Sequence, residues 1–230
     1  MAFDLTLNRL QILDRIAIQE GVMLEKIQGN FLSFPFKKDL FDLIIFNGSL
    51  EWIGSGREEV VSIREIQLNA LKKAREILKK DGKLYIGIEN SIGAKYIMGT
   101  PDDHTGISHL MYLSEEKANQ KFEQSNNNLL PAKTWSLAEY YQLFDEAGFQ
   151  TVKTYGCFPD YKLIRQMVEI DDVNRYILTG HLDVQEYNGA NGEIVEHQEE
   201  LRSIYTTLAK NNVAHLFCPS YGFVLTGKVG

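Results

Sequence analysis

A turn rich in acidic residues carries the side chains best suited to proton transfer. Residues 101–106 read Pro-Asp-Asp-His-Thr-Gly, so His104 directly follows Asp103. A carboxylate can orient an imidazole and leave its second nitrogen to act as a general base. Glu89, at the end of an expected strand, is another candidate base. Side chains of adjacent residues rarely hydrogen-bond to each other. The alternative interpretation is therefore that Asp103 and His104 belong to a plain turn without a catalytic role.

The same segment contains residue types that bind metal ions. The candidates are Asp102, Asp103, His104 and His109. Such clusters are most often solvated acidic turns, so we expect no metal at this position.

The elements that would position these residues alternate between strand-like and helix-like periods over the first ninety residues. This alternation is typical of an α/β sheet with parallel strands. The run Phe41 to Phe46 is almost wholly apolar, as expected of a strand covered on both faces. The expected strands are residues 2–5, 22–27, 41–46 and 83–88, and the expected helices are residues 8–20 and 58–80.

The second half of the chain is less regular. We expect one domain over residues 1–230, with an irregular insertion at 91–135 and a mainly helical insertion at 157–215. Between them, Ser136 is a plausible cap for a helix that ends at Gly148. The remaining expected elements are that helix at 137–147 and strands at 149–155 and 220–229.

Four stretches, in this order, resemble class I S-adenosylmethionine-dependent methyltransferases, in particular the type 11 group. They are Phe-Pro-Phe at 34–36, Phe-Asp-Leu-Ile-Ile-Phe-Asn-Gly-Ser-Leu-Glu-Trp at 41–52, the helix-to-strand turn at 73–84, and Glu-Ala-Gly-Phe at 146–149. The resemblance covers roughly residues 2–90 and 135–156 and the last strand. It implies a Rossmann-like three-layer sandwich that binds S-adenosylmethionine and transfers its methyl group.

One hallmark of that family is absent from the sequence. The family cradles the cofactor with a glycine-rich turn about twenty residues before an acid at the tip of its second strand. Here the acid that fits this tip is Asp4, with only three residues before it. We therefore expect a fold that lacks the family's first strand and helix, as in an N-terminally truncated form. That strand lies between the second and fourth in the family, so its loss would leave two unpaired edges.

The resemblance also implies a set of cofactor contacts. It places Asp4 against the ribose hydroxyls, Asn30 and Phe31 against the adenine, and Asn47 and Gly48 near the sulfonium. The competing interpretations are a helix cap for Asp4, a turn for Asn30, core packing for Phe31, and a tight turn at Gly48. Trp52 stands where the family commonly has histidine, so we assign it no proton transfer.

The function implied is methyl transfer from S-adenosylmethionine to a small-molecule or glycan-like acceptor. One alternative is a non-catalytic remnant, an interaction module whose sheet is completed by a partner chain. Another is a nicotinamide-dependent oxidoreductase, which would use Asp4 in the same way, although no Tyr-x-x-x-Lys pair lies on a suitable helix.

Composition narrows the remaining possibilities. A net charge of −7 argues against nucleic acid as an obligate partner. No apolar run approaches the ~20 residues of a membrane span, and the N-terminus lacks a signal pattern, so we expect a cytoplasmic protein.

Cys157 and Cys218 fit two buried thiols better than a disulfide or zinc site. For this mass, a compact fold would expose about 10,600 Å².

Overall fold

The computed structural model describes residues 1–56, 61–184, 187–188, 193–194 and 198–228. The strands are β1 (Ala2–Asp4), β2 (Lys26–Gln28), β3 (Phe41–Asn47), β4 (Leu78–Glu89), β5 (Phe149–Phe158), β6 (Gln166–Glu169), β7 (Tyr187–Asn188), β8 (Glu193–Ile194) and β9 (Ser220–Gly227). The α-helices are α1 (Leu7–Gln19), α2 (Ile63–Ile77), α3 (Ala94–Ile97), α4 (Glu115–Asn126), α5 (Leu137–Glu146), α6 (Val173–Leu178) and α7 (Gln198–Lys210). Short 3-10 helices are η1 (Leu50–Trp52), η2 (Ile170–Asp172) and η3 (Ala214–Phe217).

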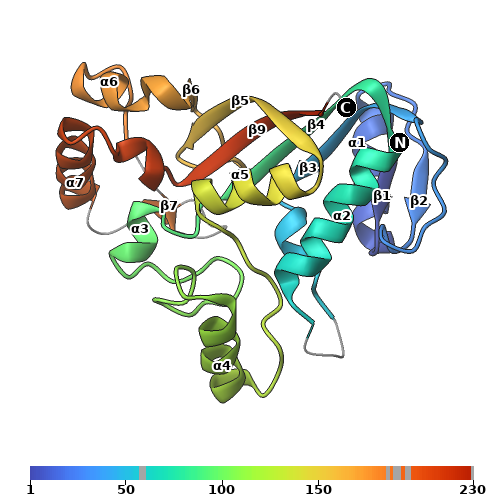
Figure 1. Ribbon diagram of the computed structural model, residues 1–230, viewed down its shortest axis with the longest axis horizontal. Coiled ribbons are helices and arrows are strands. Elements are labelled where there is room, and N and C mark those ends of the chain that lie inside the picture. Colours follow the sequence, from blue (N-terminus) through green and yellow to red (C-terminus); the bar gives the residue numbers. More distant parts are fainter. Residues whose placement is uncertain (57–60, 185–186, 189–192, 195–197, 229–230) are drawn as a thin grey trace.

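A five-stranded mixed sheet forms the centre of the molecule (Figure 1). Its strand order is β3-β4-β9-β5-β6; β3 and β4 are parallel, and β9 is antiparallel to both of its neighbours. The parallel pair brings the carboxyl ends of β3 and β4 to the same edge of the sheet. This is the α/β architecture with a central sheet and flanking helices that the sequence predicts.

The main core lies between this sheet and helices α2 and α5 and also includes residues of α6 and α7 (Figure 1). Helices α2 and α5 present apolar stripes to the sheet because their apolar residues recur at helical spacing. Helix α5 begins with a capping box, in which Ser136 and Glu139 satisfy each other's backbone amides. Phe223 of β9 contacts the rings of Tyr140 and Phe144 of α5. The central strand and α5 therefore form one packed unit.

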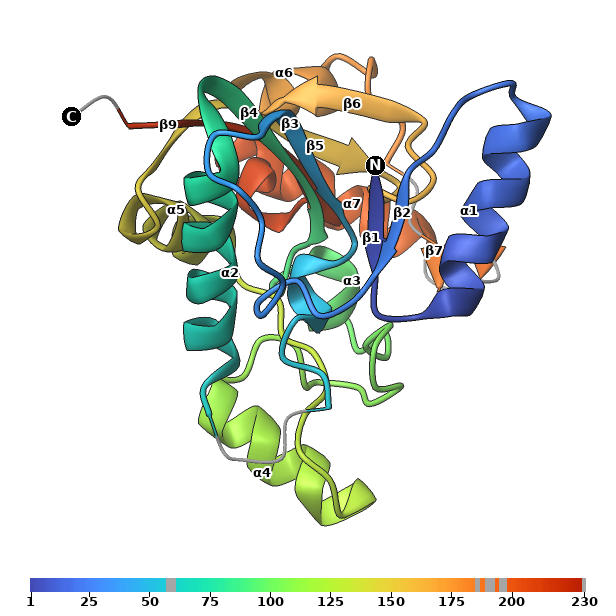
Figure 2. The same cartoon turned by 90° about the vertical axis from the view of Figure 1, so that its right-hand side faces the viewer.

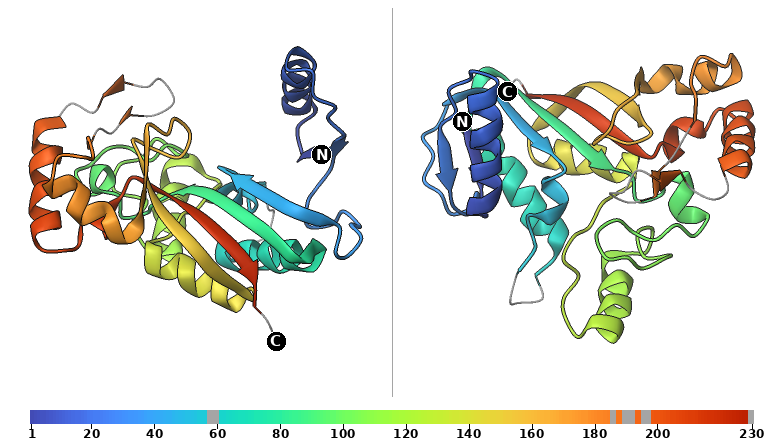
Figure 3. Two further views of the ribbon diagram at one scale, coloured as in Figure 1. Left: turned by 90° about the horizontal axis from the view of Figure 1, so that it is seen from above. Right: turned by 180° about the vertical axis from the view of Figure 1, so that it is seen from behind.

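The first two strands lie outside the central sheet. β1 and β2 pair in parallel with each other, and within the described residues neither hydrogen-bonds to β3. Figure 3 shows this N-terminal unit, with α1, set apart from the five strands, and Figure 2 shows α1 on the outer side of β1 and β2. It is joined to them mainly by phenylalanines: Phe31 contacts both Phe3 and Phe46. The expectation of a fold without a strand between β1 and β3 agrees with this arrangement.

This separation leaves apolar surface uncovered. Leu43 and Ile45 of the edge strand β3 are 53% and 58% exposed. The folded surface is 12591 Å², whereas a compact protein of this mass would expose about 10,600 Å². We attribute the additional exposed surface to the separate N-terminal unit and to the open edge of β3.

Some predicted boundaries are wrong. The helix expected at 58–80 is described from Ile63 and stops at Ile77, because Leu78 is buried and pairs with Phe41 in extended conformation; residues 57–60 lie outside the described part. The strand expected at 22–27 is reduced to β2. In the insertion expected to be irregular, α3 and α4 form; α4 was missed because it carries few apolar residues.

Downstream, the expected strand 149–155 extends to Phe158, and β6 forms inside the segment expected to be mainly helical. The glycine-rich break at 188–192 lies largely outside the described residues, as does the end of the strand expected at 220–229. Both cysteines are free and buried, as the sequence predicts. Among the described helices, none combines the length and apolar character needed to cross a bilayer.

Helix α4 caps helix α2 through a single carboxylate. Glu115 accepts hydrogen bonds from the backbone amides of Ile63 and Arg64 and from the Ser62 hydroxyl. A negative charge at a helix N-terminus compensates its unpaired amides and its dipole.

We expect Glu115→Ala to lower the free energy of unfolding by about 1–2 kcal/mol because these amides lose their acceptor. Urea denaturation followed by circular dichroism measures the change. The matched control is Glu116→Ala, which removes a neighbouring acid of the same first turn. Equal losses in the two variants would show that the Glu115 cap contributes nothing.

Candidate functional site

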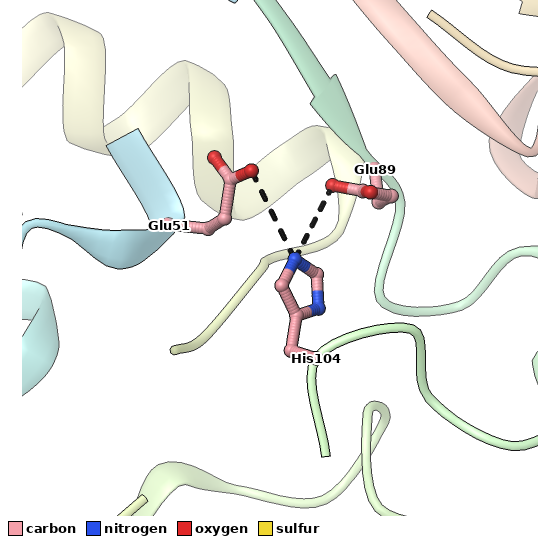
Figure 4. A group of neighbouring side chains, drawn as sticks. All are labelled: Glu51, Glu89 and His104. Carbon is pink, nitrogen blue, oxygen red and sulfur yellow. Dashed lines mark ion pairs between the residues drawn. The ribbon is translucent and has the colours of Figure 1, made fainter. Parts of the chain in front are cut away.

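Three ionisable side chains meet at the carboxyl ends of β3 and β4. Glu51 lies in η1, just after β3, and Glu89 is the last residue of β4. The turn at 101–106 folds over this edge and places His104 between them (Figure 4). Glu51 and Glu89 are 0% and 1% exposed, and the side chain of His104 is 4% exposed. Such strand ends are where open α/β sheets bind ligands.

The His104 Nε2 atom faces both glutamates. It lies 3.8 Å from Glu51 Oε1 and 3.7 Å from Glu89 Oε2, as the dashed lines in Figure 4 mark. These separations are too long for hydrogen bonds. Glu51 Oε2 and Glu89 Oε2 are buried and accept no hydrogen bond from the residues that the structure describes.

Asp102, not Asp103, orients the imidazole. His104 Nδ1 lies 2.9 Å from Asp102 Oδ1, and the Thr105 hydroxyl donates to Asp102 Oδ2 at 2.6 Å. The expected pairing of His104 with its neighbour Asp103 is therefore corrected: adjacent side chains diverge, whereas residues two apart in this turn converge. The turn is also buried at Asp102 rather than solvated.

The charges of this cluster shift one another's titration. Burial would lower the pKa of His104, but the Asp102, Glu51 and Glu89 carboxylates outweigh it and raise that pKa to about 10. Burial raises the pKa of Glu51, although His104 opposes the shift. Burial would also raise the pKa of Asp102, but bonds from His104 and Thr105 lower it overall. In the unliganded protein His104 is thus a cation at neutral pH.

Two lysines, Lys95 and Lys162, lie next to the acidic side chains of this site. Lys162 donates to Glu89 Oε1 at 2.6 Å and to Asp103 Oδ2 at 3.4 Å. Burial would lower the pKa of Lys162, but the charges of Glu89 and Asp103 raise it above its usual range. Lys95 lies 3.8 Å from Asp103. Asp103, expected to orient the base, instead balances these two ammonium groups.

Tyr161 covers the glycines at this edge. A Cβ atom on Gly48, which has a φ of +65°, would overlap the Tyr161 hydroxyl, and one on Gly87 would lie 3.2 Å from the Tyr161 ring. The same hydroxyl donates to Glu51 Oε1 at 3.4 Å. Glycine at position 48 therefore leaves room for the Tyr161 side chain, and glycine at position 87 leaves room for the side chain of Asn47 and for the Tyr161 ring.

The residues expected to bind the cofactor fall into two groups. Asp4 ends β1, as predicted, and its carboxylate accepts the Thr6 amide at 2.6 Å, as a turn-forming aspartate would. Asn30 follows β2, is exposed, and accepts the Leu32 amide at 2.9 Å. The Asn30 bond agrees with the turn interpretation. Asp4 is not the cap of α1, since the N-cap residue is Thr6 and the Asp4 carboxylate accepts the amide of that residue. The ribose and adenine contacts stay predictions.

The other expected cofactor residues lie closer to β3. The Phe31 ring packs against Phe46 of β3, which favours a core role. Asn47 ends β3 with its side chain next to Gly87, and Gly48 follows it, donating its amide to the Gly87 carbonyl at 2.9 Å. These residues are thus near the Glu51 cluster, whereas Asp4 and Asn30 belong to the separate N-terminal unit.

Sequence reasoning missed Glu51 and Lys162 as members of this site, and it considered Asp102 only as a possible metal ligand. Glu51 was visible as part of the stretch 41–52 but was noted only for its neighbour Trp52. Trp52 contributes an aromatic face to the site, since its ring centroid lies 5.1 Å from that of His104. Lys162 gave no signal because it is 73 residues from its partner Glu89.

The solved structures that are similar to this chain include S-adenosylmethionine-dependent methyltransferases. An S-adenosylmethionine-dependent methyltransferase from Methanosarcina mazei is 9% identical, with a TM-score of 0.52 over 99% of this chain and 81% of that one. A second, from Clostridium acetobutylicum, is also 9% identical, with a TM-score of 0.52 over 99% of this chain and 74% of that one. The cyclase SpnF is 13% identical with a TM-score of 0.47; 99% of this chain matches but spans only 65% of its length.

No protein-family description matches the chain, and no curated protein does. The structural similarity establishes a shared fold. At such low sequence identity it does not assign an activity to this chain. The order of elements, the parallel β3 and β4, and the antiparallel β9 agree with that fold. The chain therefore has the Rossmann-like α/β fold of class I S-adenosylmethionine-dependent methyltransferases.

Proposed function

We propose that this chain takes part in methyl transfer from S-adenosylmethionine to a hydroxyl group of a small-molecule or glycan-like acceptor. The observation that carries the proposal is the convergence of Glu51, Glu89 and His104 at the carboxyl ends of β3 and β4. Buried carboxylates with unused oxygens accept hydrogen bonds from hydroxyl groups. A polyhydroxylated acceptor matches that chemistry.

The protein's task in such a transfer is mainly positioning. When bound, the cofactor supplies the methyl group, which bonds to the acceptor oxygen as the carbon–sulfur bond breaks. Glu89 Oε2, which accepts no hydrogen bond in the structure, would take the proton released by the hydroxyl. Lys162 holds the other oxygen of Glu89 and so fixes the direction of this carboxylate.

The proposed cofactor contacts fit the structure in part. Asp4 and Asn30 follow neighbouring parallel strands, with polar side chains at adjacent strand ends. At Gly48 the Tyr161 ring already covers the backbone. A ligand that reaches Gly48 would therefore stack on this ring or displace it.

We also propose that a further parallel strand, from preceding sequence or from a partner chain, completes the sheet between β1 and β3. The exposure of Leu43 and Ile45 on the outermost strand supports this part of the proposal. The same observation favours the second candidate function, an interaction module without catalysis. The two differ in whether the chain binds the cofactor.

Calorimetric titration of S-adenosylhomocysteine into the purified chain separates the two candidates. We expect micromolar affinity, with Asp4→Asn weakening it about 10-fold or more because a charge-assisted ribose contact contributes ~1.5–3 kcal/mol. Asparagine keeps an acceptor for the Thr6 amide. Asp39→Asn is the matched control, since Asp39 is exposed and already adopts a φ of 51°, which asparagine tolerates.

A folded chain that gives no heat with millimolar S-adenosylhomocysteine would contradict the proposed transfer and favour the interaction module. A parallel titration with NADH tests the oxidoreductase alternative. Tight NADH binding without S-adenosylhomocysteine binding would replace the proposal by that activity.

A further inference from the structure

We propose that Glu51, Glu89 and His104 bind a divalent transition-metal ion, of the Mn²⁺ or Zn²⁺ type. The inference goes beyond the proposed methyl transfer, because it concerns a cation and not the cofactor or acceptor. Glu89 Oε2, the proposed proton acceptor, would bind the ion when metal is present, so its proton-accepting role belongs to the metal-free site. The inference is carried by the geometry and the unused oxygens of the cluster.

The three donor atoms already have nearly the spacing of a metal site. They lie within 4.8 Å of one another, and the two measured contacts from His104 Nε2 are 3.7 and 3.8 Å. Metal–ligand bonds of about 2.0–2.2 Å place tetrahedral ligand atoms roughly 3.4 Å apart. To complete the coordination sphere, the two separations from His104 Nε2 would have to shorten by a few tenths of an ångström, and the separation between the two glutamate oxygens, which is at most 4.8 Å, by up to about 1.4 Å.

Unused oxygens at the cluster provide an independent reason. Glu51 Oε2 and Glu89 Oε2 are buried and accept no hydrogen bond within the described part of the chain. Leaving a buried polar atom unsatisfied costs free energy, more so for a charged group. A cation bound beside His104 Nε2 would satisfy Glu89 Oε2 directly, whereas the Glu51 oxygen that faces His104 is Oε1.

Each proposed ligand is held by a neighbour that would remain outside the first coordination sphere. Asp102 binds the Nδ1 side of His104, which directs Nε2 toward the glutamates. Lys162 fixes Glu89, and the Tyr161 hydroxyl contacts Glu51. Ligating histidines almost always donate their second nitrogen to a carboxylate or carbonyl, and ligating carboxylates are themselves hydrogen-bonded.

The charge balance fits a dication. The cluster and the charged groups in contact with it comprise four carboxylates and two ammonium groups, of which that of Lys162 is 42% exposed; they are Glu51, Glu89, Asp102, Asp103, Lys95 and Lys162. With a neutral imidazole, which metal binding requires, this leaves two negative charges in excess. One nitrogen with two carboxylate oxygens suits Mn²⁺ or Zn²⁺ better than Mg²⁺, which favours an all-oxygen set.

Direct titration of metal tests this site without cofactor or acceptor. The full chain, freed of metal with EDTA and then of the chelator, is titrated with MnCl₂ or ZnCl₂ by calorimetry. We expect one saturable site. Glu51→Gln and Glu89→Gln should each lower its affinity for the metal about 10-fold to 100-fold. The matched controls Glu116→Gln and His181→Gln, both at exposed positions, should bind as the unmodified chain does.

A spectroscopic signal locates the ion. Trp52 is one of the two tryptophans in the sequence, and its ring centroid lies 5.1 Å from that of His104. Because the ion would bind next to this ring, Mn²⁺ should quench the fluorescence of Trp52. Trp52→Phe should abolish most of this quenching while leaving the calorimetric affinity within about threefold of the original.

Absence of saturable binding of either ion at millimolar concentration would overturn the inference. So would equal affinity in folded Glu51→Gln, Glu89→Gln and unmodified chains, which would mean binding elsewhere on the surface. Because no cofactor is present, failure here is distinct from failure of S-adenosylhomocysteine to bind. Circular dichroism verifies that each variant is folded before it is titrated.

Discussion

Replacing His104 with leucine is expected to lower the free energy of unfolding by about 3–5 kcal/mol at pH 7 in the presence of EDTA. The imidazolium is the cation nearest to the buried carboxylates of Glu51 and Asp102, and breaking a buried charge pair leaves an uncompensated charge. Urea denaturation of the two chains, monitored by circular dichroism, gives the difference.

The pH dependence of this difference identifies its electrostatic origin. A pKa of about 10 for His104 in the fold, against ~6.5 in the unfolded chain, gives stability that is fully present below pH 6.5. That stability is lost as pH rises through 10. The deficit of His104→Leu should therefore shrink between pH 7 and pH 10.

A double-mutant cycle with Glu51→Gln supplies the control. Removing one carboxylate should restore part of the stability lost in His104→Leu, because less negative charge remains buried without a counter-ion. A deficit that stays constant between pH 7 and pH 10, and that Glu51→Gln does not reduce, would mean that His104 acts only by filling space.

Phe223→Ala is expected to destabilise the protein by about 3–5 kcal/mol through a cavity in the core. Phe223 is fully buried on β9, the strand bonded to β4 on one side and to β5 on the other. Its ring contacts those of Tyr140, Phe144 and Tyr221. Neighbours fixed by two strand partners and by α5 have little room to collapse into the space left.

The matched comparison is Ile45→Ala on the edge strand β3. Ile45 is 58% exposed, so its truncation should cost no more than about 1 kcal/mol in the isolated chain. Thermal or urea denaturation of the two variants distinguishes a central strand from an edge strand. Equal losses would contradict the assignment of β9 as the centre of the core.

Local sequence signals predicted the elements that are themselves local. The apolar run 41–46 became β3, and the cap at Ser136 begins α5, because an apolar run or a capping pair is contained within a few residues. The burial of β3 was predicted wrongly: the strand was expected to be covered on both faces, but it is an edge strand on which Leu43 and Ile45 are exposed. The end of α2 was predicted less well. Leu78 leaves the helix to pair with Phe41, a partner 37 residues away, and no helix propensity encodes that pairing.

The candidate site shows the same division. His104 and Glu89 were identified from residue type and position, but the carboxylate that orients His104 was assigned to the wrong aspartate. Whether Asp102 or Asp103 faces the imidazole depends on the backbone path of a buried turn. That path is set by packing over the strand ends.

From the sequence alone, the α/β fold class and the strand near Asp4 could be predicted, and Glu89 and His104 could be named as candidates for chemistry, because periodicity and residue chemistry are properties of short segments. Their catalytic roles stay predictions. Only the tertiary structure brings Glu51, Glu89, His104 and Lys162 together, from segments up to 111 positions apart in the chain. The parallel pairing of β3 and β4 and the folding of two loops over their ends decide this meeting, since contacts between distant segments arise from packing and leave no pattern along the chain.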